Sequence, residues 1–352
     1  MMMTGPWLLY GANGYTGGLV ARLAHARGHR PVLAGRRAAE VCALAEELQL
    51  ERRLFDLDDP ARIDDAVGGM SLVLHCAGPF SRTARPMAEA CLRTRTHYLD
   101  ITGEVGVFEE LAARDAEARA ATVMLLPGCG FEVVPSDCLA VHLKGRLPEA
   151  RRLALAYAAS GRVSRGTAIT AIEGLGRGGL ARCGGVLTPV PSAWKTRRID
   201  FGDGPRAAIT LPLGDLTTAW HSTGIPDIET YFAAPAGLRA VAVAARYAGS
   251  LLGSQAVRRR LGARVRAGAP GPSAEERRQG RGFVWGEVED DAGRRATSRL
   301  ATPDGYTFTA HAALAVVERA LAGEAPAGFQ TPGKVHGPDF VLGLEGVTRT
   351  DL

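Results

Sequence analysis

Short apolar runs alternate with segments of helical periodicity in the first third of the chain. Runs typical of strands lie at 7–10, 31–35, 53–56, 71–76, 97–100 and 122–126. Helical patterns between them include 38–48, 86–93 and one long helix over 104–119. Near-continuous apolar runs are typical of parallel strands that are buried on both faces. Their order predicts the α/β fold class, with a Rossmann-type doubly wound parallel sheet in residues 1–130.

The pattern changes after about residue 130, where strand-like segments cluster. They lie at 153–158, 185–189, 196–201, 208–211, 229–233, 283–287 and 297–301. Helical patterns near 166–178, 238–252 and 309–321 interrupt them. This order predicts a second, α+β domain over 131–352, built on a mainly antiparallel sheet. The segment 309–352 is a candidate to pack back on the first domain.

A glycine-rich turn, GANGYTG at 11–17, joins the first expected strand to the first expected helix. In such strand–turn–helix units, backbone N–H groups and the positive helix N-terminus point at a pyrophosphate. The glycines permit a tight turn, close approach of the phosphate and close packing of the helix on the sheet. The alternative is a purely structural turn. We assign cofactor binding to Gly11, Asn13, Gly14, Tyr15, Thr16 and Gly17.

The second expected strand ends in a basic pair, Arg36 and Arg37. An NAD site has an acidic residue roughly twenty residues beyond the glycine turn, where it binds the ribose 2′-hydroxyl. Here no acidic residue occurs before Glu40. Two guanidinium groups instead stand where a 2′-phosphate needs them. The sequence therefore favours NADP(H) over NAD(H) as the cofactor.

Glycine-containing turns with polar or reactive groups follow the fourth, fifth and sixth expected strands, at 76–80, 100–104 and 127–132. Ligands of doubly wound sheets bind at these carboxyl ends of the strands. We therefore assign six further residues to cofactor binding: Asp56, Cys76, Ala77, Gly78, Pro79 and Phe80. The candidate catalytic residues are Tyr98, Glu104, Cys129 and His221.

Each catalytic candidate has a structural alternative. Tyr98 shares a strand face with Asp100, so one of the two could anchor the following loop. Glu104 could complement a helix dipole instead of touching cofactor or substrate. Cys129 is expected at the exposed sheet edge, where it could simply be a small residue in a tight turn. His221 lies in a polar segment of the second domain, where a lone histidine is more often structural.

Two further patterns bear on the chemistry. Ser136 and Asp137 follow a proline and are typical of a helix N-cap with an acid in the first turn. No lysine has a tyrosine four positions before it, which excludes the Tyr–Lys solution of short-chain dehydrogenases. The proton donor must therefore be another group or water.

Composition narrows the functional class. With 352 residues, 46% of them hydrophobic and 22% charged, the chain fits two globular domains. The net charge is +5, and nearly all of the basic residues are arginines. Short arginine runs such as 258–260 are expected to be solvated helix faces, so we exclude nucleic-acid binding. The six cysteines show no C-x-x-C spacing and no HExxH occurs, so no metal site is expected.

No membrane span is expected either. The longest apolar helix candidate, 238–252, is too short and too charged to cross a bilayer. The first expected strand begins at residue 7, without a preceding signal-peptide pattern. The simplest expectation is a reduced, cytoplasmic, soluble protein.

With these motifs in place, the chain resembles the saccharopine dehydrogenase-like oxidoreductases, and within them the bacterial subgroup that includes trans-acting enoyl reductases. The residues that carry the resemblance are AGRR at 34–37, CAGPF at 76–80, HYLDITGE at 97–104, PGCGFEVVPSD at 127–137, STGIPDIETY at 222–231 and GFQTPGKVHGPDF at 328–340, together with the glycine turn. The resemblance implies an NADP(H)-binding domain, a second domain that covers the nicotinamide, and hydride transfer to a C=C or C=N bond.

These observations predict an NADPH-dependent reductase of an activated double bond, preferentially the C=C of an enoyl-type or natural-product intermediate. Two alternatives stay open. One is saccharopine-type reduction of an imine, and the other is a non-catalytic NADPH-binding sensor. The expected partner is a small-molecule substrate, and the second domain is a candidate surface for a homodimer.

Overall fold

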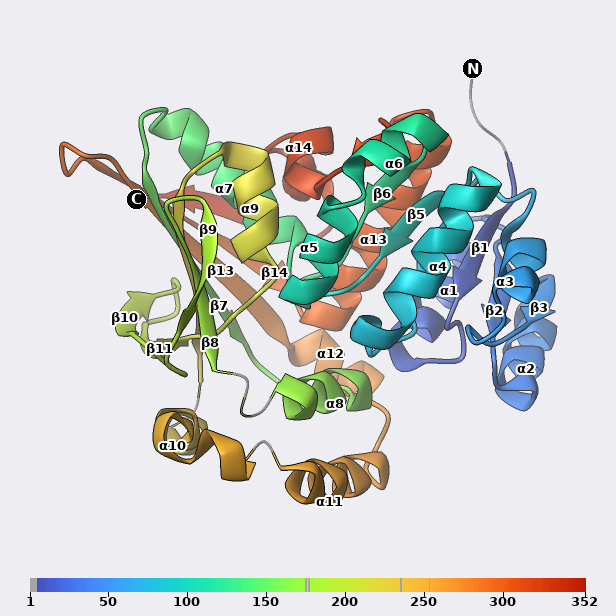
Figure 1. The fold of residues 1–352 in the computed structure, drawn as a ribbon, viewed down its shortest axis with the longest axis horizontal. Helices are drawn as coiled ribbons and strands as arrows, with labels where there is room; N and C mark the ends of the chain where they lie inside the picture. The colour runs from blue at the N-terminus through green and yellow to red at the C-terminus, as the bar shows by residue number, and fades with distance from the viewer. Residues whose placement is uncertain (1–4, 175, 177, 235, 253) are drawn as a thin grey trace. The chain divides into compact units, whose positions relative to one another are not determined.

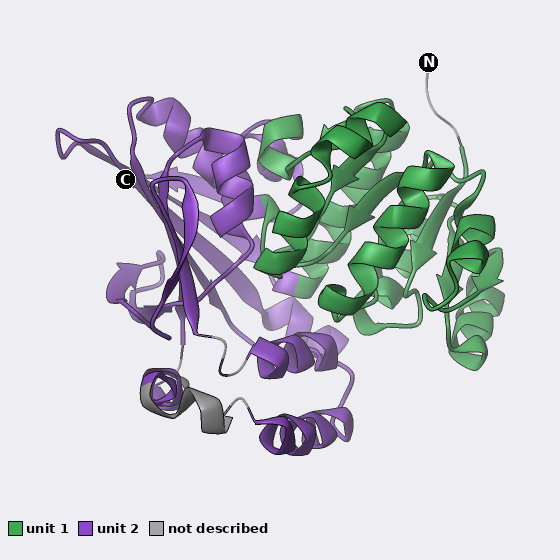
Figure 2. Ribbon diagram, in the orientation of Figure 1, with its two compact units in different colours: residues 1–134, 306–335 green, residues 135–305, 336–352 purple. Residues whose placement is uncertain are grey.

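The computed structural model describes residues 5–352 except 175, 177, 235 and 253. Contacts divide the chain into two compact units (Figure 2). Unit 1 comprises 1–134 and 306–335, and unit 2 comprises 135–305 and 336–352. The chain thus leaves unit 1 after the sixth strand and returns to it for a helix near its end (Figure 1).

Unit 1 is built on a parallel sheet with the strand order β15-β6-β5-β4-β1-β2-β3. Its strands are β1 (Trp7–Tyr10), β2 (Val32–Gly35), β3 (Arg52–Leu54), β4 (Leu72–His75), β5 (His97–Asp100), β6 (Met124–Leu126) and β15 (Gly328–Phe329). Every neighbouring pair runs parallel. All six predicted strands are present, and the Rossmann-type sheet is confirmed. The two-residue β15 carries no sequence signal of its own and extends the sheet beyond β6.

The helices of unit 1 connect these strands. They are α1 (Tyr15–Ala26), α2 (Ala38–Leu48), α3 (Pro60–Val67), α4 (Phe80–Thr94), α5 (Val105–Ala112), α6 (Asp115–Ala121), most of α13 (Gly305–Leu321) and most of α14 (Pro332–His336). The prediction of one long helix over 104–119 is wrong. The backbone at Arg114 (φ −95°, ψ 12°) leaves the helical conformation, and its guanidinium reaches Glu89 of α4 at 2.7 Å and Glu117 at 3.1 Å.

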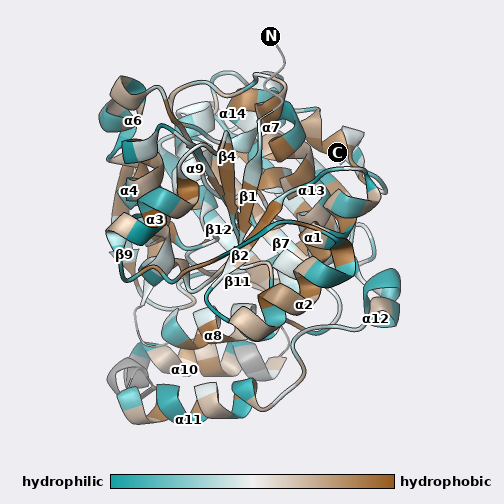
Figure 3. Cartoon of the chain, turned by 90° about the vertical axis from the view of Figure 1, so that its right-hand side faces the viewer, coloured by the Kyte–Doolittle hydropathy of each residue, from teal (hydrophilic) through white to brown (hydrophobic). Residues whose placement is uncertain are grey.

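The core of unit 1 follows from strands that are buried on both faces. Leu8 and Leu9 of β1 and Leu72 and Leu74 of β4 have no exposed surface. Figure 3 shows β1 and β4 in brown, the hydrophobic end of the scale. Burial on both faces is why these strands are continuous apolar runs in the sequence. The carboxyl ends of the strands are the places where polar groups enter.

Unit 2 contains a nine-stranded sheet whose main path is β10-β11-β12-β7-β13-β14-β16. Its strands are β7 (Arg152–Ala159), β8 (Gly179–Cys183), β9 (Val186–Val190), β10 (Thr196–Asp200), β11 (Pro205–Thr210), β12 (Asp227–Ala233), β13 (Arg281–Glu289), β14 (Arg295–Pro303) and β16 (Thr348–Asp351). Among the described residues of this sheet, β12 and β7 pair in parallel and the other pairs are antiparallel. The predicted, mainly antiparallel second sheet is confirmed, with β8 and β16 as unpredicted additions.

The helices of unit 2 are α7 (Val134–Arg146), α8 (Arg165–Gly174), α9 (Asp215–Thr223), α10 (Ala236–Leu252), α11 (Gln255–Arg266) and α12 (Ala274–Gln279), with a short 3₁₀ turn η1 (Phe340–Gly343). The predicted helix 166–178 corresponds to α8, and positions 175 and 177 of that prediction lie outside the described residues. Helix α7 packs on the sheet, because a Cβ at Gly286 of β13 would lie 2.7 Å from Leu143.

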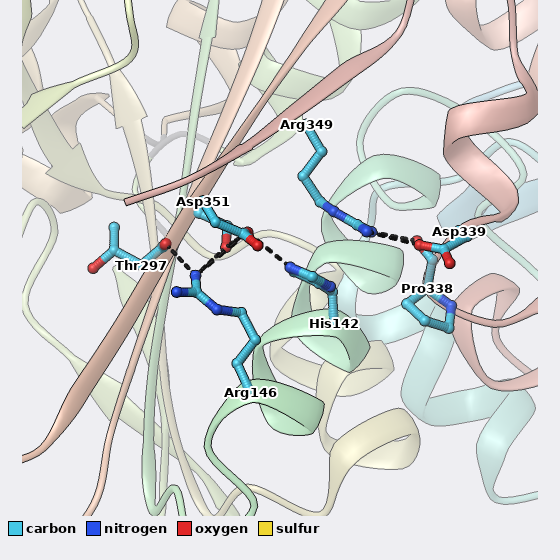
Figure 4. Close-up of polar contacts among 8 residues, drawn as sticks. His142, Arg146, Thr297, Pro338, Asp339, Arg349 and Asp351 are labelled. Carbon is cyan, nitrogen blue, oxygen red and sulfur yellow. Dashed lines mark hydrogen bonds and ion pairs between the residues drawn. The ribbon is translucent and has the colours of Figure 1, made fainter.

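The carboxyl-terminal strand β16 is held to β14 and α7 by a polar cluster (Figure 4). The Asp351 carboxylate accepts a hydrogen bond from Ser298 at 2.6 Å, and lies 2.8 Å from the His142 ring and 3.4 Å from the Arg146 guanidinium. These partners, first the Ser298 hydroxyl, lower the pKa of Asp351. The strand is thereby tied to two other elements of unit 2.

Candidate functional site

The glycine turn between β1 and α1 has a geometry that only glycine satisfies. Gly11 has φ +81°, and a Cβ there would lie 2.8 Å from the backbone nitrogen of Ala77. A Cβ at Gly17 would collide with the carbonyl oxygen of Gly11. The first glycine therefore permits contact with the loop after β4, and the last permits α1 to pack against the turn.

The N-terminus of α1 suits a bound anion. Gly14 occupies the N-cap position and has no side chain that could cap the helix, and the first turn of α1 has no acidic residue. No acidic side chain of this turn therefore opposes the positive end of the helix dipole, which favours a phosphate there. Together with the close approach at Gly11, this geometry fits the pyrophosphate of a dinucleotide.

The basic pair after β2 has two distinct environments. When the side-chain amide of Asn13 is oriented with its oxygen toward Arg37, this oxygen accepts hydrogen bonds from Arg37 Nε at 2.9 Å and Nη2 at 3.0 Å. Arg37 also lies 3.0 Å from Glu40. Arg36 is exposed and, among the described residues, has no carboxylate partner. Arg36 is therefore the guanidinium that is ready to bind a 2′-phosphate, whereas Arg37 is fixed by its neighbours.

Asp56 lies just beyond β3, is exposed, and accepts a hydrogen bond from the backbone N–H of Asp58 at 3.2 Å. This contact closes a local turn.

The loop after β4 is organised by Glu104. The Glu104 carboxylate accepts hydrogen bonds from the backbone N–H groups of Phe80 at 2.8 Å and Ser81 at 3.2 Å. It therefore caps α4, which begins at Phe80. The sequence left two roles open for Glu104: contact with cofactor or substrate, or interaction with a helix dipole. The observed contacts match the second role, but the helix is α4 and not α5, which follows Glu104 in the chain. The loop 76–80 is fixed as a consequence.

Tyr98 and Asp100 form the centre of a buried hydrogen-bond network. The Tyr98 hydroxyl donates to Asp100 at 2.7 Å, and the Asp100 carboxylate also accepts from the backbone N–H groups of Thr102 and Gly128, each at 2.9 Å. Tyr98 and Asp100 therefore share a strand face, as predicted. Burial raises the pKa of Asp100 to about 6 and that of Tyr98 well above its ordinary value. The network ties the loops after β5 and β6 together.

The prediction that Cys129 is exposed at the sheet edge is wrong. Its backbone N–H donates to the Asp100 carbonyl at 2.7 Å, which turns the residue inward and leaves no exposed surface. The Cys129 thiol donates to the Leu126 carbonyl at 3.4 Å, and burial raises its pKa. Cys76 is also buried with a raised thiol pKa. A protonated, buried thiol is a poor nucleophile.

His75, at the carboxyl end of β4, is a residue that the sequence reasoning missed. It has no exposed surface, and neither ring nitrogen has a hydrogen-bond partner in the part of the chain that the structure describes. Its ring lies 5.4 Å from Tyr10, 5.3 Å from Phe80 and 6.3 Å from Tyr98. Burial lowers its pKa from 6.5 to about 3. The available signal was a single titratable residue at the end of an otherwise apolar strand.

His221 belongs to unit 2, in the last turn of α9, where it is exposed. Its neighbour Trp220 is covered by the Arg182 guanidinium, 5.6 Å from the ring centroid. The sequence indicated only a polar segment around His221, whereas the structure has helix α9 there. Whether His221 takes part in catalysis stays a prediction.

The interpretation of Ser136 as an N-cap is wrong, because α7 already begins at Val134. Ser136 lies in the first turn, where its hydroxyl hydrogen-bonds to Asp215 and accepts from Tyr157 at 2.5 Å. Tyr157 also donates to Asp215 at 2.7 Å, and burial raises the pKa of Asp215 to about 7. These residues form a second buried polar network, which was not predicted.

The described residues contain no group of three or more His, Cys, Asp or Glu side chains that could hold a metal ion. Within the same residues, every helix is too short or too polar to cross a membrane.

Comparison with known proteins identifies the first unit. Residues 7–126 match the saccharopine dehydrogenase NADP binding domain. A trans-acting enoyl reductase from Mycobacterium leprae (strain TN) is 36% identical over 154 residues, which are 41% of this chain and 36% of that protein. A second, from Mycobacterium ulcerans (strain Agy99), is 30% identical over 152 residues, 40% of this chain and 36% of that protein. The matched part spans about a third of the length of these curated relatives.

The fold has a solved counterpart in the apo, histidine-tagged saccharopine dehydrogenase (L-Glu forming) from Saccharomyces cerevisiae. The two are similar with a TM-score of 0.66 at 14% identity, over 99% of this chain and 100% of that one. The predicted fold class, the predicted resemblance and the NADP(H) cofactor are confirmed. Residues 7–126 are therefore similar to a saccharopine dehydrogenase NADP-binding domain, and the chain as a whole shares the fold of saccharopine dehydrogenase.

Proposed function

We propose that this protein is an NADPH-dependent reductase that transfers hydride to an activated C=C bond of an enoyl-type or natural-product intermediate. The observation that carries the proposal is the NADP-binding turn with Arg36 exposed beside it. The choice of bond is supported by the relatives named trans-acting enoyl reductase. NADPH, when bound, supplies the hydride.

The residues proposed to hold the dinucleotide are those of the turn 11–17, Arg36 and the loop 76–80. Backbone amides at the start of α1 would bind the pyrophosphate, and Arg36 would bind the 2′-phosphate. Glu104 is proposed as a positioning residue, since its carboxylate fixes the first amides of α4 and thereby the loop 76–80.

The proton donor is proposed from the solvent exposure of the remaining candidate side chains. Tyr98 and Cys129 are fully buried and hold their protons tightly, so they are poor donors to a substrate. His221 is exposed and stays the residue to test first, with water as the alternative. A His221→Asn variant that lowers kcat without changing NADPH affinity would support His221 as the donor.

The test of the reaction is NADPH consumption by the purified protein with two substrate types in parallel. We expect oxidation with a crotonyl-type thioester and none with a keto acid plus an amine. The reverse result would establish imine reduction, the alternative supported by the fold shared with saccharopine dehydrogenase. Saturable NADPH binding without consumption across a broad substrate panel would instead identify a sensor.

We also propose that the second unit forms a homodimer surface. Light scattering after gel filtration would decide it. A mass near the 37.1 kDa of one chain would contradict it.

A further inference from the structure

The positive charge of this protein is concentrated in one stretch. Residues 230–274 contain seven arginines and no acidic residue, so the stretch carries a formal charge of +7 where the whole chain carries +5. Outside it, acidic residues outnumber basic ones by two. The stretch includes α10 and α11 of unit 2. Its charge is therefore a local property of these helices and not a general excess of arginine.

Helix α11 exposes an unneutralised basic face. Arg259, Arg260, Arg264 and Arg266 are exposed, and the buried Gly262 lies close to the Arg266 guanidinium. No carboxylate of the described residues pairs with any of these four arginines. Many other surface arginines of this protein are paired, for example with carboxylates at 2.6 to 2.9 Å. Four unpaired guanidinium groups on one helix repel each other, and an anionic partner would relieve that repulsion.

Helix α10 exposes an apolar face. Val241 and Val243 are 48% and 36% exposed, and Ala240 and Ala244 beside them are exposed as well. The arginines of this helix do not cover that face, because their guanidinium groups donate to backbone carbonyls, at 2.8 Å from Arg239 to Ala234 and at 2.7 Å from Arg246 to Ser192. Figure 3 shows teal bands along α11 and brown or pale tones on the described part of α10.

The composition of these faces points to the class of partner. A second copy of this chain is disfavoured, because a twofold contact would place the four arginines against the same four. A specific protein interface needs directional hydrogen bonds and usually aromatic anchors. The exposed positions described here offer alanine, valine, leucine and arginine, with Gln255 as the neutral hydrogen-bonding side chain. A lipid surface requires only positive charge and a shallow apolar face.

We propose that α10 and α11 dock this protein on an anionic lipid surface. The guanidinium groups of Arg259, Arg260, Arg264 and Arg266 pair with lipid phosphates, and Val241 and Val243 enter the boundary between headgroups and acyl chains. The association is peripheral and sensitive to salt, because most of its attraction comes from exposed charges. It does not depend on the reaction that the protein catalyses.

The experiment is co-sedimentation of the full-length protein with vesicles. One set is phosphatidylcholine alone, and the other contains about one third phosphatidylglycerol, both at roughly physiological ionic strength. We expect binding to the second set only, and loss of binding on the order of a thousandfold when four arginines are replaced. The replacements are Arg259→Gln, Arg260→Gln, Arg264→Gln and Arg266→Gln.

The matched control removes the same charge from paired, exposed arginines of unit 1, with Arg22→Gln, Arg62→Gln, Arg85→Gln and Arg119→Gln. This variant is expected to keep most of its vesicle binding. A second variant, Val241→Glu with Val243→Glu, should bind as weakly as the α11 variant, whereas Val186→Glu on β9 should not. Circular dichroism spectra and saturable NADPH binding identify folded variants.

Four outcomes would overturn the proposal. Equal binding to both vesicle sets would show that lipid charge does not drive the association. An unchanged affinity of the α11 variant would show that these arginines do not contribute to it. Equal losses in the α11 variant and in its control would show that net charge alone matters. Absence of vesicle binding in the wild type would also reject the lipid surface and leave an acidic protein as the partner to seek.

Discussion

Acidification is expected to destabilise unit 1 through His75. The side chain has no exposed surface and neither ring nitrogen has a partner, so protonation would create an uncompensated buried charge. This burial lowers the pKa from 6.5 to about 3. In the unfolded chain the same imidazole accepts a proton below its ordinary pKa. Between the two pKa values the unfolded state therefore binds one proton more than the folded state, and stability rises with pH.

The magnitude follows from this linkage. Each pH unit inside the window changes the free energy of unfolding by about 1.4 kcal/mol. Lowering the pH from about 7 to about 5 covers roughly 1.5 units of the window and should cost about 2 kcal/mol through this residue alone. A His75→Leu variant removes the titration. It also loses ring contacts worth about 1 kcal/mol and two unsatisfied polar atoms, but these terms do not depend on pH.

The assay is urea unfolding, followed by circular dichroism, at the two pH values. The wild type should lose about 2 kcal/mol more than His75→Leu on acidification. Leu74→Val, on the same buried strand, serves as a control whose offset from the wild type should be equal at both pH values. Asp100 and Asp215 titrate in the same range but are present in all three proteins, so their contributions cancel. Equal acid sensitivity of the wild type and His75→Leu would refute the reasoning.

Four further predictions test other parts of the structure. Arg36→Ala should weaken NADPH binding by about 10- to 100-fold and leave NADH binding unchanged, as read by nicotinamide fluorescence; equal weakening of both would contradict the role of Arg36. Glu104→Gln should cost about 1 kcal/mol in unfolding free energy and weaken NADPH binding, because α4 loses the charge at its N-terminus; unchanged values would argue against the cap. Asp215 has a folded-state pKa of about 7, raised from 3.8, so the folded state binds the extra proton between these values and stability falls as the pH rises from about 4 to 7. Asp215→Asn should remove that slope, and its persistence in urea unfolding across this range would show that Asp215 is not the group responsible. Ellman's reagent should react quickly with Cys183, which is exposed, more slowly with Cys42, and with the four buried cysteines only after unfolding, so that rapid labelling of Cys129 would contradict its burial.

The contact between Glu104 and the first amides of α4 shows why contacts between loops cannot be predicted from the sequence. Phe80 and Glu104 are 24 residues apart, and the sequence predicts a helix start at Glu104 but places the helix after β4 only at 86–93. Their hydrogen bond exists because β4 and β5 are neighbours in a parallel sheet, which brings the loops that follow them together. Nothing in the local pattern around Glu104 distinguishes a cap for α5 from a cap for α4.

The prediction that Cys129 is exposed was wrong for a related reason. Its position between two glycines indicates a tight turn, and a turn at a sheet edge is usually exposed. The inward direction is set by the hydrogen bond to the Asp100 carbonyl and by the left-handed conformation of Gly128, which lies close to Phe108. Those contacts come from other strands and helices, so no window of the sequence around Cys129 contains them.

The sequence by itself determined the elements whose environment is uniform along their length. Strands covered on both faces must be apolar throughout, and the turn after β1 must have glycine where a Cβ would meet the backbone at Ala77, so both leave a local record. Arg36 and Arg37 likewise indicate NADP(H), because a guanidinium at a strand end is a local feature. Only the tertiary structure decided which of the two arginines is left without a partner, which thiols are buried, and which helix Glu104 caps. The physical reason is that burial and hydrogen bonding depend on residues distant in sequence, and these meet only when the sheet has formed.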